Sequence, residues 1–180
     1  MINSFHTLPY YKYTVTDWPT KKIKMQEAMK HQVFSKIDDS SILNFYSDRS
    51  NYRNYNKDFL SIFKDELEAF GQELKLEFFK IEDIWTVEYH TGQYHSIHTH
   101  GNGNLSAILY FDQDEIEHSS THFVVGTDYI NNTTEIVSPP IKEGEIIIFP
   151  SHILHFTTPN NSKKTRRIIS FDITFIKKFS

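Results

Sequence analysis

Residues 94–101, YHSIHTHG, contain two histidines, His98 and His100, that are separated by a single residue. Side chains alternate between the two faces of an extended chain, so both imidazoles point to the same side if this stretch is a strand. A third histidine, His155, lies at the end of a later predicted strand segment. Three imidazoles arranged in this way can bind one face of a metal ion and leave the opposite face open.

The sequence on both sides of this pair is typical of strands and a turn. Residues 85–89 (WTVEY) and 105–111 (LSAILYF) are rich in β-branched and aromatic side chains. Residues 101–104 (GNGN) can turn the chain between them. The pair is therefore expected at a strand end, where functional residues tend to collect, although a polar hairpin end without any ligand has the same features.

His155 also lies next to a predicted strand. Residues 146–149 (IIIF) form an apolar run that is too short for a helix and is stopped by Pro150, which predicts a buried strand. His152, in the turn that follows, is the alternative ligand to His155. Residues 165–176 predict a final strand with two different faces. One face carries Ile169, Phe171, Ile173 and Phe175, and the other carries Arg166, Ile168, Ser170, Asp172 and Thr174.

Four segments, in this order, resemble the iron(II)- and 2-oxoglutarate-dependent oxygenase superfamily. They are His98-Thr99-His100 and residues 105–110, 143–155 and 166–171. Within the superfamily they look like the small, prolyl-hydroxylase-like branch found in phages and marine microbes. The resemblance covers about half of the chain, from Trp85 to Phe175. It implies a mainly β fold, a double-stranded β-helix (jelly-roll) of two facing sheets, with N-terminal helices packed on the outside.

The resemblance also implies roles for individual residues. The family's first metal-binding histidine corresponds to His98 and its distal one to His155, and the metal is Fe(II). Arg166 corresponds to the basic residue that pairs with the far carboxylate of the cosubstrate, 2-oxoglutarate, a task that suits a planar guanidinium. Tyr110 corresponds to a tyrosine that often shares this carboxylate. Ser170, on the same face of the strand as Arg166, is the third residue predicted to bind the cosubstrate.

One position departs from the family's pattern. The family carries His-x-Asp or His-x-Glu, whereas this chain has His100 at the second position. Three histidines leave the site one negative charge short of the usual triad of two histidines and one carboxylate, although imidazole binds iron(II) well. Either all three histidines bind the metal, or a carboxylate from elsewhere is a ligand, or only His98 and His155 bind and water completes the coordination.

The predicted function is that of a 2-oxoglutarate-dependent dioxygenase that hydroxylates a peptidyl or small-molecule substrate. Two alternatives remain open. One is a non-catalytic, cupin-like jelly-roll that binds a metal or another ligand, and the other is a three-histidine dioxygenase or isomerase that does not use 2-oxoglutarate. Arg166 discriminates between them, because only the first function requires a buried cation at a cosubstrate's length from the metal.

Composition excludes several other classes of protein. The net charge of −4 provides no global field that attracts nucleic acid. The chain has no cysteine, which excludes disulfides, zinc–thiolate sites and thiol catalysis. No apolar run approaches the length of a membrane span, and the N-terminal residues lack the pattern of a signal peptide. We therefore expect a soluble, cytoplasmic protein without nucleic-acid or membrane partners.

The 180 residues suit one structural domain with two parts. Residues 1–80 are expected to form a helical or irregular N-terminal extension, and residues 81–180 the jelly-roll metal-binding core. Residues 20–36 are loosely periodic, which indicates a helix. Residues 46–56 form a polar loop with interleaved tyrosine and arginine, a pattern more typical of a solvated surface than of a substrate site.

A clearer helical pattern follows from residue 58. The apolar positions that recur at helical spacing are Phe59, Leu60, Phe63, Leu67 and Phe70. Asp58 is the predicted N-cap, and Gly71 is the predicted stop signal. The apolar stripe is expected to pack on the outside of one sheet.

Overall fold

The computed structural model describes residues 10–39, 43–101, 103–128 and 130–177. The strands found in them are β1 (Tyr11–Thr14), β2 (Ser35–Asp39), β3 (Leu43–Ser47), β4 (Leu76–Tyr89), β5 (Tyr94–His98), β6 (Leu105–Asp112), β7 (His122–Asp128), β8 (Thr133–Val137), β9 (Glu145–Pro150), β10 (His155–Thr157) and β11 (Arg166–Lys177). The helices are α1 (Trp18–Ala28), α2 (Asn56–Ile62) and α3 (Lys64–Glu73).

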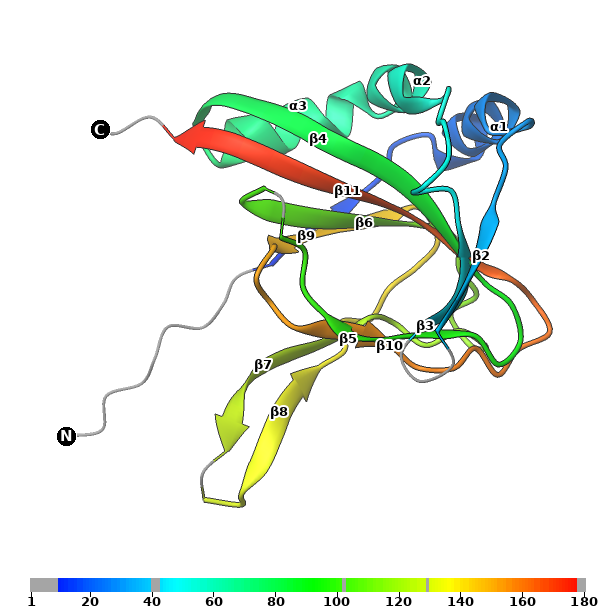
Figure 1. The fold of residues 1–180 in the computed structure, drawn as a ribbon. Helices are drawn as coiled ribbons and strands as arrows, with labels where there is room; N and C mark the ends of the chain where they lie inside the picture. Colours follow the sequence, from blue (N-terminus) through cyan, green and yellow to red (C-terminus); the bar gives the residue numbers. More distant parts are fainter. Residues whose placement is uncertain (1–9, 40–42, 102, 129, 178–180) are drawn as a thin grey trace.

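The strands join in one antiparallel sheet that curls on itself. Their order is β1-β9-β6-β11-β4-β3-β5-β10-β7-β8, and β2 pairs with β3. The layer that contains β9, β6, β11 and β4 lies across the interior from β5, β10 and β7 (Figure 1). This mainly β architecture of two facing layers, with few helices, confirms the predicted jelly-roll.

The central strand β11 is hydrogen-bonded to β4 on one side and to β6 on the other. Its outer face joins the core beneath the helices through Ile169, Phe171 and Ile173. Its inner face lines the interior of the curled sheet, and it carries Arg166, Ile168, Ser170 and Asp172. The alternation that was read from residues 165–176 therefore separates a packing face from a face that is available for a site.

The three helices cover the outer face of the layer formed by β9, β6, β11 and β4 (Figure 1). Phe59, Phe63 and Phe70 are fully buried in this helix–sheet interface. The ring of Phe59 packs against the ring of Phe171 with their centroids 5.2 Å apart. The predicted packing of the apolar stripe agrees with this arrangement for Phe59, Phe63, Leu67 and Phe70, whereas Leu60, which was also placed in the stripe, is 41% exposed.

The boundaries predicted for the helix between Asp58 and Gly71 were wrong. The chain leaves the helical conformation at Phe63 (φ −103°, ψ 19°), so two helices replace one. Asp58 lies in the first turn of α2, where Tyr55 is the N-cap residue. Gly71 does not end α3, which continues to Glu73. A Cβ atom at Gly71 would lie 2.9 Å from the Phe79 ring, so this glycine permits close packing of α3 on β4.

The N-terminal part of the chain contains strands as well as helices. The helix predicted for residues 20–36 spans only α1, and residues 35–39 form β2. β1 pairs with β9, and β3 pairs with β4 and β5, so this part contributes to the curled sheet. β4 runs across residue 80, where the division into two parts was placed, and that division stays a prediction. None of the described helices combines the length and apolar composition that a membrane span requires.

Phe59→Ala is expected to lower the free energy of unfolding by about 3–5 kcal/mol, because it leaves a cavity between α2 and β11. Urea denaturation followed by circular dichroism measures the change. Phe78→Ala is the matched control, since its ring on β4 is 54% exposed, and a change of only about 0.5 kcal/mol is expected there. Equal losses in the two variants would contradict this account of the helix–sheet core.

Candidate metal centre

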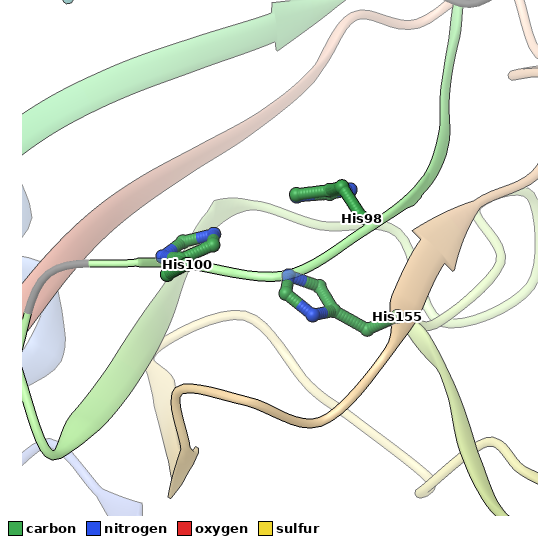
Figure 2. A group of neighbouring side chains, drawn as sticks. All are labelled: His98, His100 and His155. Carbon is green, nitrogen blue, oxygen red and sulfur yellow. The ribbon is translucent and has the colours of Figure 1, made fainter.

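The pairing of β10 with β5 brings two of the predicted ligands together. In this antiparallel ladder His155 lies directly opposite His98. His100 follows two residues after the end of β5, and its backbone N–H donates a 3.0 Å hydrogen bond to the carbonyl of Ser151. Figure 2 shows the rings of His98, His100 and His155 gathered around a common space.

The three imidazoles are close enough to serve one ion. One ring nitrogen from each of them lies within 4.8 Å of those of the other two. In the described residues this is the one group of three or more histidine or acidic side chains that meets this condition. The site residues predicted from the His-x-His pair and the distal histidine therefore converge. His152, the alternative ligand to His155, is exposed.

Hydrogen bonds fix which nitrogen of each ring is free. The Nδ1 atom of His98 lies 2.8 Å from the carbonyl of Ser96, and that of His155 lies 2.9 Å from the carbonyl of Ile153. Carbonyl oxygens only accept hydrogen bonds, so both Nδ1 atoms carry the proton. His100 Nδ1 lies 2.8 Å from the carboxylate of Asp172. Each ring thus leaves Nε2 available, which is the arrangement typical of metal-binding histidines.

Burial keeps the imidazoles of His98 and His155 neutral. It lowers the pKa of His98 to about 4, with a further decrease from the neighbouring His100 and Arg49. Burial also lowers the pKa of His155 to about 3, again helped by the adjacent histidines. A neutral imidazole has a lone pair to donate, so these side chains do not have to lose a proton before they bind a metal near neutral pH.

The histidines open into a cavity of about 220 Å³ inside the curled sheet. Its apolar walls include Trp85, Val87, Ile108 and Ile168, and Ser170 also lines it. His95, which the sequence did not single out as a ligand, belongs to this wall as well. Its ring stacks on that of His98 with a centroid separation of 3.7 Å.

The loop of residues 46–56 is not only a solvated surface. Arg49 lines the cavity, and its guanidinium lies over the ring of Trp85, 4.2 Å from the ring centroid. In the sequence, only the interleaved tyrosine and arginine of this loop indicated that it could contact a ligand. They could not show which side chain would turn toward the cavity, because that depends on the pairing of β3 with β4.

Arg166 is buried in the interior, and no carboxylate of the described residues pairs with it. It is 1% exposed, its Nε donates to Gln113 and its Nη2 donates to Thr121. Its Nη1 has no hydrogen-bond partner in the described residues. The guanidinium lies 5.8 Å from the ring centroid of Tyr110, whose hydroxyl also reaches Thr121. A buried cation of this kind is costly unless an anion binds to it.

Arg167 faces the opposite side of β11. It forms ion pairs with Glu88 and Asp112 at 2.6 and 2.8 Å. Ile169 and Phe171 share its strand face, which predicts core packing on that side, but this side chain forms ion pairs because both neighbouring strands supply carboxylates at this level of the sheet. Three further residues near the site were missed, namely Gln113, Thr121 and Asp172. Of these, Asp172 could have been found from the sequence, since it shares the strand face of Arg166.

Comparison with known protein families assigns the chain to one of them. A family model described as "Putative 2OG-Fe(II) oxygenase" matches residues 83–172, which are 90 of the 180 residues. The chain belongs to this family, whose members use Fe(II) and 2-oxoglutarate, and it is a 2-oxoglutarate-dependent oxygenase. The predicted family and cofactors are confirmed. Membership does not favour either alternative, the non-catalytic jelly-roll or the enzyme independent of 2-oxoglutarate.

Solved structures share the fold at low sequence identity. A prolyl-4-hydroxylase from Pseudomonas putida is 14% identical with a TM-score of 0.61, over 96% of this chain and 94% of that chain. The viral collagen prolyl hydroxylase of Paramecium Bursaria Chlorella virus-1 is 16% identical (TM-score 0.60, 91% and 94% covered). HygX from Streptomyces hygroscopicus, with nickel, 2-oxoglutarate and hygromycin B bound, is 10% identical (TM-score 0.65, 97% and 86% covered). No curated protein sequence matches the chain.

Arg166→Met is expected to leave the unfolding free energy of the ligand-free protein unchanged or to raise it by up to about 4 kcal/mol, because it removes a buried charge that has no counter-ion. Arg167→Met is the matched control and should lower the free energy by about 1 kcal/mol through its lost ion pairs. Thermal and urea denaturation measure both. A larger loss for Arg166→Met than for Arg167→Met would contradict the account of Arg166 as an uncompensated cation.

Proposed function

We propose that His98, His100 and His155 bind Fe(II) and that Arg166 binds the far carboxylate of 2-oxoglutarate in an oxygenase that hydroxylates a peptidyl or small-molecule substrate. The observation that carries the proposal is one interior that holds three converging imidazoles with free Nε2 atoms and a buried guanidinium with a free Nη1. The first group fits a divalent metal, and the second fits an anion.

The side chains around Arg166 fit a carboxylate. Its free Nη1 is a donor without an acceptor, and the hydroxyl groups of Tyr110 and Thr121 lie beside the same guanidinium. Gln113 holds Nε and so orients the planar fork. Ser170 lies on the same face of β11, between Arg166 and Asp172 along the strand, and it lines the cavity that contains the histidines. These residues would bind and orient the cosubstrate.

The rest of the cavity has a protective role in this proposal. Bound together, Fe(II) and 2-oxoglutarate supply the oxidation of an unactivated carbon by dioxygen. The apolar walls around the same space are formed by Trp85, Val87, Ile108 and Ile168. Such walls exclude water, which strengthens the electrostatic contacts inside and limits side reactions.

The size of the cavity limits how a substrate can enter. Its volume of about 220 Å³ lies below the roughly 300–1,000 Å³ of common ligand pockets, and 2-oxoglutarate would take part of it. The substrate would therefore insert a small group, such as one amino-acid side chain, while the remainder stays outside. This fits a peptidyl substrate and also a small molecule that is oxidised at a protruding group.

His155→Ala is expected to abolish tight Fe(II) binding, because the side chain provides a buried ligand on β10, directly opposite His98 on β5. Anaerobic calorimetric titration with Fe(II) measures this. His152→Ala is the matched control, since it removes an exposed histidine three residues earlier and should bind Fe(II) like the wild type. If the two variants bind Fe(II) equally well, the assignment of the metal site is wrong.

Arg166→Met is expected to weaken 2-oxoglutarate binding by at least about tenfold, the loss that corresponds to one charge-assisted hydrogen bond of roughly 1.5–3 kcal/mol. The readout is the weak visible charge-transfer band that forms when 2-oxoglutarate chelates Fe(II) without oxygen. Fe(II) affinity itself should not change. Arg167→Met, which alters the other face of β11, should keep wild-type affinity for 2-oxoglutarate. Wild-type affinity in Arg166→Met would refute the role given to this arginine.

A further inference from the structure

Asp172 is a fully buried carboxylate behind one of the candidate ligands. It is 0% exposed and lies at the centre of the sheet, on the inner face of β11. Its Oδ1 accepts a 2.8 Å hydrogen bond from His100 Nδ1 and another of 2.8 Å from the hydroxyl of Ser106, which lies opposite it on β6. Its Oδ2 has no hydrogen-bond partner in the described residues.

No permanent cation compensates this carboxylate. Among the described side chains, His100 is the only basic group that pairs with Asp172, and it is charged only if protonated. Asp83 lies opposite Asp172 on β4, and the nearby arginines pair with Asp83 instead of with Asp172. Arg53 binds Asp83 at 2.6 Å, and Arg49 lies 3.9 Å from it. A buried carboxylate without a cation is costly, so the arrangement requires a positive charge that the protein alone does not provide.

We propose that Asp172 is the positioning residue that supplies, through His100, the negative charge that a ligating carboxylate would otherwise bring to the metal. This inference rests on the proposed Fe(II) site at the three histidines. Asp172 holds the proton of His100 on Nδ1, directs Nε2 toward the metal and makes the ring a stronger donor. The bound metal, in turn, provides the positive charge that Asp172 lacks.

The geometry separates this role from direct ligation by Asp172. The group of nitrogens that lie within 4.8 Å of one another contains His98, His100 and His155, and Asp172 is not part of it. The Oδ1 atom of Asp172 is engaged with His100 Nδ1, which is not the ring nitrogen left available for a metal. Among the three possibilities that the sequence left open, this arrangement favours a metal bound by three histidines with the acid behind one of them.

Asp172→Asn tests the charge with almost no change of shape. Fe(II) affinity, measured by anaerobic calorimetry with the metal alone, should fall by about 10- to 100-fold, the usual effect of removing a partner that orients a metal ligand. Asp83→Asn is the matched control, because it neutralises the carboxylate directly opposite on β4, which pairs with Arg53. It should bind Fe(II) like the wild type.

A double-mutant cycle distinguishes this role from a structural one. His100→Asp puts a carboxylate back at the second position of the motif. In that background Asp172→Asn should leave Fe(II) affinity unchanged or raise it, because two facing carboxylates repel each other and one of them is neutralised. A structural role for Asp172 would give the same loss of affinity in both backgrounds, and that result would overturn the proposal.

Imidazole ¹⁵N NMR of the wild-type protein gives a second measurement that needs no variant to fold. With Zn(II) as the probe, His100 Nδ1 should keep its proton while the Nε2 resonance shifts. A shift of Nδ1, or none at either nitrogen, would refute the inference. Failure of the proposed function looks different: wild-type protein that binds no Fe(II), or His155→Ala that binds it normally, would remove the metal site itself. Intact metal binding with wild-type affinity in Asp172→Asn would overturn the role of Asp172 alone.

Discussion

β11 is hydrogen-bonded along both edges, so the alternation of its side chains between two faces is fixed by β4 and β6 together. Ile169, Phe171 and Ile173 must then point toward the helices, and Arg166, Ser170 and Asp172 must point inward. A shift of one residue would exchange these two sets and would bury the charges under the helices. The apolar contacts of the outer face therefore hold the polar residues of the inner face in register.

The interior contains two charges of opposite sign that do not pair with each other. In the part of the chain that the structure describes, Arg166 lacks an anion at one end of β11, and Asp172 lacks a permanent cation six residues away along the strand. Each unpaired buried charge lowers the stability of the ligand-free protein. Such unfavourable arrangements are found at functional sites, and other parts of the fold compensate for them. A metal next to His100 and a dicarboxylate that reaches Arg166 would correct both deficits at once. The helix–sheet core supplies the stability that permits them.

Much of this arrangement could be predicted from local sequence pattern. Periodicity gave the strands around the site and the two faces of β11, and the resemblance to oxygenases gave the expected roles of His98, His155 and Arg166. The break at Phe63 could not be read, because apolar positions keep helical spacing across it. The pairings of β1 with β9 and of β3 with β5 could not be read either, nor could the contact between His100 and Asp172, since all of them join residues far apart in the chain.

The three histidines differ in what orients them. The Nδ1 atoms of His98 and His155 bond to carbonyls two residues earlier in the chain, so their ring orientations are set locally. The Nδ1 of His100 bonds to Asp172, which is 72 positions away. His100 also lies beyond the end of β5, where a backbone hydrogen bond to Ser151 holds it instead of a strand ladder. Its orientation therefore exists only once β11 has joined the sheet, and this makes the third ligand, unlike the other two, a product of the completed fold.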